Sequence, residues 1–185
     1  MGRTRRASSG PSRIAPATLG PLLLGTVLLA ALLLGAGCAA PVPPGAAKVG
    51  EIVPDFDLPS LAGDSMARAD LLGEGPVVLN FWATWCGPCL REIPALQELH
   101  RAGSARVVSI ALDQGGEEIL RPFVEKEGIG YPVLIGDIAL LQQYGGSGIP
   151  FTLILDESLQ VREIHRAMVS LRTLERGLRK AMEPL

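Results

Sequence analysis

The sequence predicts an α/β domain in which helices cover both faces of a central β-sheet of mixed strand direction. Between residues 49 and 185, apolar runs of strand length alternate with segments of helical periodicity, which favours parallel strands joined through helices. Two further apolar runs near the C-terminus are separated only by a short polar turn, which predicts an antiparallel hairpin. A segment of this length can bury a sizeable core.

The first part of this domain predicts two strands and a helix. Val53–Leu58 alternates apolar and polar side chains, as a short edge strand does. Val77–Ala83 is almost continuously apolar, which is typical of a strand buried on both faces. Pro94 lies inside the helix that follows and should kink it. The helix ends before Gly103, and its apolar side chains recur at helical spacing: Cys89, Ile93, Leu96 and Leu99.

In the middle of the domain, the sequence predicts a strand, a helix, another strand and a second, shorter helix, in that order. Val107–Leu112 is a second buried strand, and Tyr131–Ile135 is a third. Glu117–Glu127 between them is a helix that ends at Gly128. A short helix, Ile138–Tyr144, follows the third strand.

The C-terminal part predicts the hairpin and a last helix. Phe151–Leu155 and Val161–His165 are strands joined by the turn Asp156-Glu157-Ser158. Ser170 can cap the final helix. We expect that helix to bury one apolar stripe: Leu171, Leu174, Leu178 and Met182.

The charges are unevenly distributed along the chain. Its net charge is −2, and Arg3, Arg5, Arg6 and Arg13 are the only charged residues before Lys48. Without these four arginines, 13 basic residues stand against 19 acidic ones, a net charge of −6. The composition therefore excludes a basic nucleic-acid-binding surface as the leading function.

The N-terminus is organised like a secretory signal. A basic region ends at Arg13, the apolar stretch Leu19–Leu34 follows, and small residues lead to Cys38. A cysteine directly after a small residue resembles the signal of a bacterial lipoprotein, in which cleavage leaves that cysteine free for lipid attachment. We therefore expect residues 1–37 to be a lipoprotein-type signal peptide and Cys38 to be the lipidation site. Gly35 departs from that pattern, because the position usually holds Leu, Val or Ile.

Two other interpretations of the N-terminus remain open. Thr18–Gly37 is uncharged and about 20 residues long, enough for one bilayer crossing as an uncleaved anchor. A plain cleaved signal is the third interpretation. All three place the folded domain on the extracytoplasmic face of a bacterial membrane. Residues 38–48 are rich in Pro and Ala and predict a stiff tether, so the folded domain is expected over residues 49–185.

The segment Trp85-Cys86-Gly87-Pro88-Cys89 joins the first buried strand to the following helix. A thiol at a helix N-terminus is stabilised as a thiolate by free N–H groups and by the helix dipole, which lower its pKa. The second thiol lies one turn further on, where it can close a disulfide and is more buried. An exposed attacking thiolate followed by a resolving thiol is the arrangement that disulfide exchange requires.

Two other uses of this cysteine pair are less consistent with the sequence. A zinc site needs two further ligands, and with Cys38 in the leader only His100 and His165 remain, far apart in the sequence. A purely structural disulfide gains little from closing a two-residue loop. We therefore favour redox exchange and expect no metal and no organic cofactor.

The segment Phe81-Trp82-Ala83-Thr84-Trp85-Cys86-Gly87-Pro88-Cys89 resembles the active-site segment of the thioredoxin superfamily. Pro54-Asp55-Phe56, Asn80 and Glu92-Ile93-Pro94 resemble its TlpA/ResA-type extracytoplasmic branch. The resemblance covers residues 49–185. It implies a thioredoxin-like fold with an N-terminal strand extension.

The same resemblance extends to the second half of the domain. Residues 117–135 correspond to an inserted helix and strand, and Gly148-Ile149-Pro150 matches the cis-proline loop of the family. By this likeness Cys86 is the nucleophile and Cys89 is the resolving thiol. Pro150 would be cis and face Cys86, so that backbone beside it, at Ile149, could pair with a substrate strand.

The likeness also assigns the neighbouring residues. Trp85 would shield the disulfide from one side, while Trp82 is expected to pack in the core. The Gly87-Pro88 dipeptide is that of the reducing members. His100 and His165 are expected to be surface or hairpin residues.

Two departures from the family pattern affect the site. Asn80 stands where cytoplasmic thioredoxins carry a buried Asp, and an amide cannot accept the proton of the resolving thiol. Glu92 is a candidate for this proton transfer, although an exposed helix glutamate is the interpretation we favour. Phe151 follows the cis-proline, where relatives often have Thr or Glu, so the partner is not indicated.

The leading function is a membrane-tethered thiol–disulfide oxidoreductase that reduces disulfide-bonded proteins. By analogy with the family, its substrates include apocytochrome c, and a membrane protein supplies its electrons. A peroxiredoxin-like enzyme is an alternative, but that signature has Thr or Ser three residues before its cysteine and Pro seven before. Neither cysteine has this signature. The residues three and seven positions before Cys86 are Ala83 and Leu79, and those before Cys89 are Cys86 and Trp82. A copper chaperone of the same fold would have three residues between its cysteines.

Overall fold

The computed structural model of the chain describes residues 46–73 and 75–183. The predicted signal peptide, Cys38 and most of the predicted tether lie outside the described residues. Ala46 and Ala47 are buried, and Ala47 belongs to a hydrophobic cluster of the domain. The packed domain therefore includes the last residues assigned to the tether.

A five-stranded mixed sheet forms the centre of the domain, in the order β5-β4-β3-β6-β7. β3 pairs in parallel with β4, and β4 with β5, whereas β3 to β6 and β6 to β7 are antiparallel. The strands are β3 (Val77–Trp82), β4 (Arg106–Ala111), β5 (Val133–Ile135), β6 (Phe151–Leu155) and β7 (Val161–His165). This is the α/β architecture with a mixed sheet that the sequence predicts.

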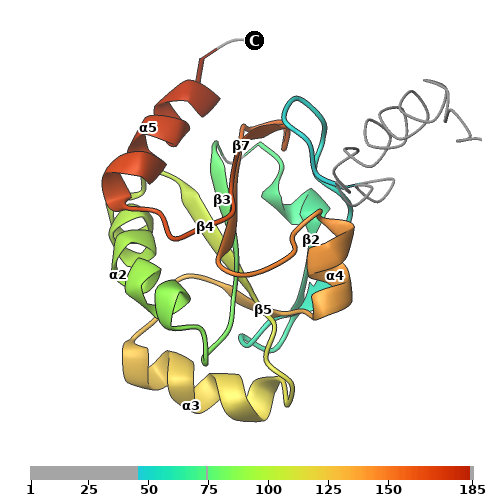
Figure 1. Cartoon of the computed structure of the whole chain (residues 1–185), viewed down its shortest axis with the longest axis vertical. Helices are drawn as coiled ribbons and strands as arrows, with labels where there is room; N and C mark the ends of the chain where they lie inside the picture. The colour runs from blue at the N-terminus through green and yellow to red at the C-terminus, as the bar shows by residue number, and fades with distance from the viewer. Residues whose placement is uncertain (1–45, 74, 184–185) are drawn as a thin grey trace, which may run out of the picture. The chain divides into compact units, whose positions relative to one another are not determined.

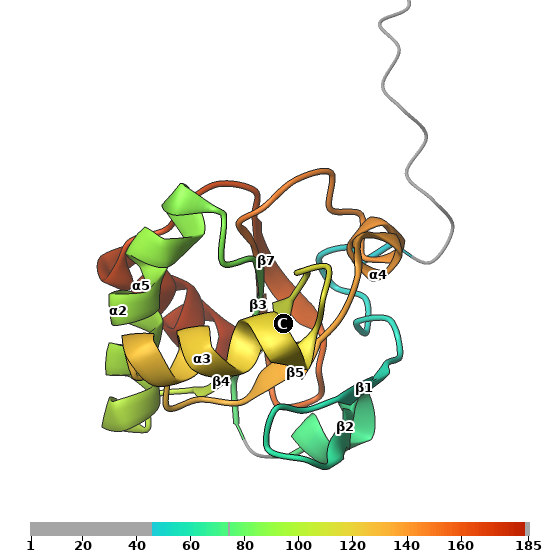
Figure 2. The ribbon, with the colours of Figure 1, turned by 90° about the horizontal axis from the view of Figure 1, so that it is seen from below.

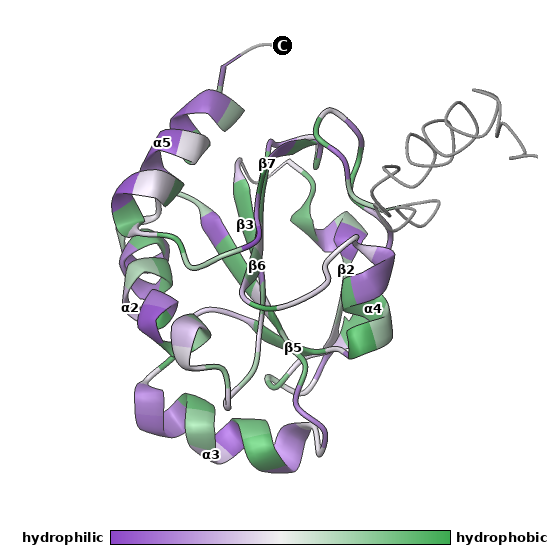
Figure 3. Ribbon diagram, viewed as in Figure 1, coloured by the Kyte–Doolittle hydropathy of each residue, from purple (hydrophilic) through white to green (hydrophobic). Residues whose placement is uncertain are grey.

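Helices cover both faces of the sheet (Figures 1 and 2). Residues of α2, α3 and α5 pack on one face in a hydrophobic cluster that includes both cysteines, and α4 packs on the other face. The helices are α2 (Gly87–Ala102), α3 (Glu117–Glu127), α4 (Ile138–Gln143) and α5 (Leu171–Ala181). Hydrophobic residues run along β3, β4 and β5, while α3 and α5 carry many hydrophilic ones (Figure 3).

The segment before the sheet differs from its prediction. Val53–Leu58 is not an edge strand of the main sheet. Instead, β1 (Asp57–Pro59) pairs with β2 (Ser65–Ala67) in a separate antiparallel pair, followed by the 3₁₀ helix η1 (Arg68–Leu71). Val53 and Phe56 are buried, so this alternation reflects the anchoring of an extended segment on the core rather than strand pairing.

The final helix also differs at its end. Ser170 caps α5, because its side chain accepts a hydrogen bond from the N–H of Thr173. Leu174 and Leu178 are buried, but Met182 is 63% exposed because the helix ends at Ala181. Met182 is therefore wrongly placed in the predicted apolar stripe.

Both helices with internal prolines continue past them. α2 contains Pro94 and runs from Gly87 to Ala102, and α3 contains Pro122. Gly103 and Gly128 end α2 and α3 in the left-handed conformation, which glycine adopts without the steric cost of a side chain.

Candidate active site

The cysteine pair lies where β3 passes into α2. β3 is buried along its whole length and ends at Trp82. Cys86 is the N-cap of α2 and has extended backbone geometry, and Pro88 follows in the first turn. Cys86 and Cys89 are joined by a disulfide, and the N–H of Cys89 donates a hydrogen bond to the Cys86 Sγ at 3.3 Å. The helix N-terminus thus directs an N–H group at the first sulfur, as a thiolate requires.

The two cysteines are less different in exposure than the sequence suggested. Cys86 is 6% exposed and Cys89 is 2% exposed, so in the disulfide form neither side chain is open to solvent. The expectation of an exposed Cys86 is wrong for this oxidised state, because both cysteines belong to the hydrophobic cluster that α2, α3 and α5 form on one face of the sheet. Gly87 and Pro88, in contrast, are exposed.

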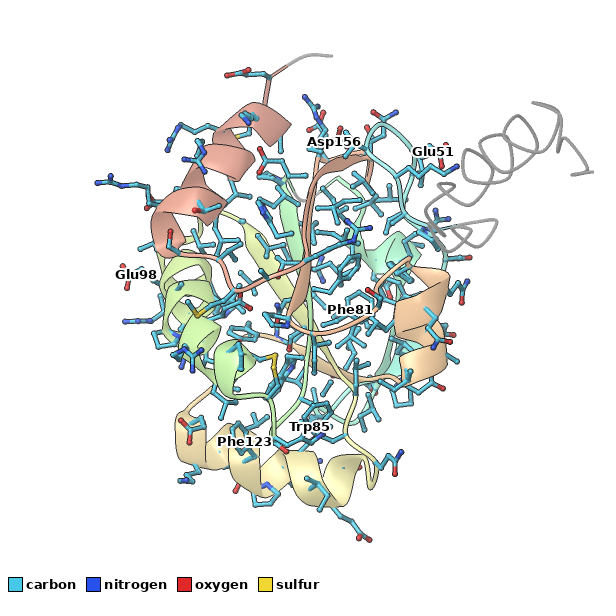
Figure 4. All side chains as sticks on the ribbon, in the orientation of Figure 1. Glu51, Phe81, Trp85, Glu98, Phe123 and Asp156 are labelled. Atoms are coloured by element: carbon cyan, nitrogen blue, oxygen red, sulfur yellow. A yellow bond between two sulfur atoms is a disulfide. The ribbon has the colours of Figure 1, made fainter. Side chains whose placement is uncertain are left out.

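Trp85 stands outside the core beside the disulfide. Its side chain is 68% exposed, the largest exposure among the large hydrophobic side chains of the described residues. Figure 4 shows Trp85 and the disulfide at the same end of the domain, with Asp156 at the opposite end. Trp85 does not stand alone, because the exposed Ile138 lines the same groove, and neighbouring exposed apolar side chains are typical of a binding surface.

A loop between α4 and β6 forms the second wall of the site. The Ile149–Pro150 peptide bond is cis, which agrees with the expectation for this loop. A groove of about 270 Å³ lies between Trp85 and this loop. Its walls are mostly apolar, with Ile149 and Gly148 from the loop and Ile138 and Leu141 from α4. The groove is suited to an extended peptide that would lie against Trp85, the residue before Cys86.

Glu92 is buried behind the cysteines, and the expectation of an exposed helix glutamate is wrong. It lies one turn beyond Cys89 on α2 and is 1% exposed. Its Oε1 accepts a hydrogen bond from the N–H of Val169 at 2.6 Å, and its Oε2 accepts one from Asn80 Nδ2 at 3.3 Å. The sequence could not reveal this, because the loop that covers Glu92 is 77 residues away along the chain.

Burial makes the carboxyl group of Glu92 a weaker acid than usual. Desolvation raises the pKa of its carboxyl group from 4.5 to about 7, although the hydrogen bonds from Val169 and Asn80 partly oppose the shift. A carboxyl with a pKa near neutrality can both accept and return a proton at physiological pH. Burial also raises the pKa of Tyr131, and the nearby charge of Glu92 adds to that effect.

Two residues of this network are not identified by the sequence analysis. Thr152 accepts a hydrogen bond from Asn80 Nδ2 at 2.9 Å, and it lies directly opposite Asn80 in the pairing of β3 with β6. Val169 precedes the cap of α5 and contributes its backbone. Asn80 and Thr152 are each a polar residue within an apolar strand. Buried polar groups need hydrogen-bond partners, and this is the one sequence signal that could have indicated their contact.

The remaining candidates lie apart from the cysteines or in the core. Trp82 is buried and packs on Phe123 of α3 with ring centroids 5.7 Å apart, which agrees with its expected core role. His100 makes an edge contact with the ring of Tyr131, and His165 pairs with Glu163 on β7.

Within residues 46–73 and 75–183, no group of three or more His, Cys, Asp or Glu side chains could hold a metal ion. Over the same residues, no helix has the length and apolar character needed to cross a bilayer.

Comparison with known proteins gives the family. The model of the AhpC/TSA family matches residues 49–167, which covers most of the domain and includes both cysteines. The chain belongs to the AhpC/TSA family. Within this thioredoxin-like family, the relatives named ResA are thiol–disulfide oxidoreductases, and its Cys pair and fold make this chain a thiol–disulfide oxidoreductase as well.

Three similar proteins illustrate the relationship. The thioredoxin-like protein YneN of Bacillus subtilis is 32% identical over 133 residues, which cover 70% of this chain and 78% of the relative. The thiol-disulfide oxidoreductase ResA of Geobacillus kaustophilus is 35% identical over 136 residues, which cover 72% and 78%. A thiol:disulfide interchange protein from Chlorobium tepidum superposes with a TM-score of 0.63 at 26% identity, covering 75% of this chain and 100% of that one.

Proposed function

We propose that this AhpC/TSA-family chain reduces protein disulfides on the extracytoplasmic side of a bacterial membrane, with Cys86 and Cys89 as a reversible dithiol. One observation carries the proposal: the Cys86–Cys89 disulfide caps α2 at the same end of the domain as the exposed Trp85. The apolar groove between Trp85 and Ile149 gives a substrate segment a place to bind beside the residue that precedes Cys86.

Reduction proceeds in two exchanges. The Cys86 thiolate attacks one sulfur of the substrate disulfide, forms a mixed disulfide, and expels the other sulfur, which takes up a proton. Cys89 then loses its proton and attacks the Cys86 sulfur, which forms the intramolecular disulfide and releases the second substrate sulfur as a thiol. The substrate gains two electrons and two protons. The chain supplies both electrons and the Cys89 proton, and solvent supplies the second proton, because Cys86 has already given up its own proton as a thiolate.

Glu92 is the proposed proton acceptor for Cys89. It is buried one helical turn beyond Cys89, and its pKa of about 7 lets it take a proton at neutral pH. Asn80 cannot accept this proton, but its amide holds one Glu92 oxygen in place. The role that a buried Asp has in cytoplasmic thioredoxins therefore passes here to a glutamate from the helix.

Apocytochrome c is the substrate that we propose to test first, because the resemblance to the TlpA/ResA branch favours it. The groove beside Trp85 suits the extended residues that flank a Cys-x-x-Cys-His haem-attachment site, while the disulfide between its two cysteines closes a tight turn. A peptide of this sequence, oxidised to its disulfide, should be reduced faster than a peptide in which the disulfide closes a long loop. Equal rates would contradict a preference for apocytochrome c.

The direction of electron flow is tested by the reduction potential. A reductase should equilibrate near the potential of thioredoxin, about −270 mV, and a membrane protein would then have to return its electrons. Equilibration of the chain with defined dithiol buffers and thiol counting gives this value. A potential close to −120 mV, which is roughly that of a strong disulfide donor, would contradict the reductase assignment.

Tethering through Cys38 is a separate part of the proposal. The basic, apolar and small segments before Cys38 support it. In cells, Cys38→Ser should abolish lipid labelling and leave residues 1–37 attached. If the wild-type chain carries no lipid and also retains its first residues, an uncleaved N-terminal anchor replaces this proposal.

A further inference from the structure

The turn that carries Trp85 and Cys86 is tied to the end of the neighbouring strand by one buried carboxylate. Asp113 follows β4, and its side chain is buried. The backbone N–H of Thr84 donates to both Asp113 oxygens, at 3.1 and 3.2 Å, and the Thr84 hydroxyl donates to Oδ1. Both polar donors of Thr84, two residues before Cys86, therefore end on the same carboxylate.

The fold makes this contact possible because β3 and β4 are parallel neighbours. Trp82 lies opposite Ala111, and the N–H of Leu112 donates to the carbonyl of Trp82 at 2.9 Å. The segments that follow β3 and β4 therefore leave the sheet side by side. The first leads to Cys86 and the second leads to α3. The carbonyl of Asp113 accepts the N–H of Gly116 at 3.3 Å, so the same residue also shapes the approach to α3.

The hydrogen bonds to Asp113 leave the turn little freedom. Thr84 is held through its backbone and its side chain, and the N–H of Cys86 donates to the carbonyl of Ala83 at 3.1 Å. Charge-assisted hydrogen bonds to a buried carboxylate are stronger than neutral ones. The position of the Cys86 sulfur at the N-terminus of α2 therefore depends on where Thr84 is held.

We propose that Asp113 is a positioning residue for the exchange reaction and acts on Cys86 through Thr84. It touches no reacting atom. It holds the turn in the geometry in which the helix N-terminus stabilises the Cys86 thiolate, and without it the sulfur moves out of that geometry. A misplacement of this kind lowers the rate of a reaction that depends on alignment.

The test uses three variants of the full-length chain, purified in detergent and reduced. Thr84→Val removes the hydrogen bond from the Thr84 hydroxyl and keeps the carboxylate. Asp113→Ala removes every hydrogen bond between Thr84 and the Asp113 side chain, and the third variant combines both changes. The rate of Cys86 alkylation by iodoacetamide is measured against pH, together with the free energy of unfolding. Alkylation needs no substrate protein, so its result is independent of whether the proposed substrates are correct.

We expect Thr84→Val and Asp113→Ala to shift the alkylation profile to higher pH and to slow the reaction at pH 7 about threefold or more, the change that half a pKa unit gives. The double variant should be no slower than Asp113→Ala, because both changes interrupt the same path. Thr84→Ser, which keeps the hydroxyl, should retain the wild-type profile.

Asp156 provides a matched control. It is also buried, and it accepts the N–H groups of Ser158 and Gln160 in the turn after β6, at the opposite end of the domain from Trp85. Asp156→Ala should lower the free energy of unfolding and leave the alkylation profile unchanged.

Two results would overturn the proposal. Unchanged profiles in Thr84→Val and Asp113→Ala, with only the free energy of unfolding lowered, would show a purely structural role. A profile that shifts to lower pH in Asp113→Ala and stays in place in Thr84→Val would show that the carboxylate acts through its charge alone.

Discussion

The side-chain amide of Asn80 donates a hydrogen bond to the carboxylate of Glu92 inside the domain, at 3.3 Å. The two residues come from β3 and α2, and the second hydrogen of the amide goes to Thr152 on β6. An ionised Asp could not donate either bond. Asn80 is therefore matched to its two acceptors, the buried carboxylate of Glu92 and the hydroxyl of Thr152.

Glu92→Gln should change how stability depends on pH. The pKa of Glu92 is about 7 in the folded chain and near 4.5 when unfolded, so the folded state binds more protons between these values. Stability due to this group is then present below pH 4.5 and is lost as pH rises through 7, a change on the order of 3 kcal/mol. Urea unfolding of the oxidised protein at pH 5 and pH 8 measures it, and Glu92→Gln should show a much smaller difference. Parallel pH dependence in both proteins would rule out the raised pKa.

Asn80→Asp should destabilise the domain most at alkaline pH. The change places a second carboxyl group within hydrogen-bond distance of Glu92, and two such charges in a buried site cannot both form without a large cost. At pH 5 one proton can be shared between the two groups, so the loss should be smaller than at pH 8, where we expect about 2 kcal/mol or more. Asn80→Ser, which adds no charge, is the control for the lost amide. Equal losses in both variants at pH 8 would mean that the carboxyl groups do not interact.

The two thiols should react at different rates in the reduced protein. Cys86 is at the N-terminus of α2, where the N–H of Cys89 points at its sulfur, and Cys89 is further inside the hydrophobic cluster. Iodoacetamide at pH 7 should therefore modify Cys86 at least about tenfold faster than Cys89. Peptide mass spectrometry of timed samples gives both rates. Similar rates at the two positions would remove the basis for their separate roles.

Gly177 should be intolerant of even a methyl group. It lies inside α5 against β6, and a Cβ there would stand 2.3 Å from Ile154 Cδ1 and 2.8 Å from Glu163 Oε2. Ala is the better helix former by about 1 kcal/mol, but crowding of the core should outweigh that gain, so Gly177→Ala should lower the free energy of unfolding by about 1–3 kcal/mol. Arg176→Ala on the exposed side of α5 is the control and should change it by less than about 0.5 kcal/mol. A stabilised Gly177→Ala would show that α5 is packed more loosely.

Local patterns in the sequence were sufficient to predict most of the fold. The strands Phe151–Leu155 and Val161–His165 and the helix Glu117–Glu127 have the predicted bounds, since each depends on its own apolar pattern and on nearby turn residues. β1 and β2 were missed because three-residue strands leave almost no periodic signal. The cysteine motif was likewise visible in the sequence, because it lies within one short segment.

The parts of the site that depend on long-range contacts could not be predicted. The burial of Glu92 depends on the loop at Val169, and the hold on Thr84 depends on Asp113, which is 29 residues away. A helical glutamate and a polar residue after a strand are ordinary surface features when judged from sequence alone. Only the packing of α5 and the parallel pairing of β3 with β4 turn them into buried, hydrogen-bonded groups.

The central claim, that Cys86 attacks and Cys89 resolves, is tested most directly by trapping the intermediate. Reduced Cys89→Ser and reduced Cys86→Ser are each mixed with a disulfide-bonded peptide, and the products are identified by intact mass and peptide mapping. Cys89→Ser should accumulate a stable mixed disulfide on Cys86, because the thiol that resolves it is gone, and Cys86→Ser should accumulate little or none. A mixed disulfide that forms mainly on Cys89, or equally in both variants, would contradict the assigned roles.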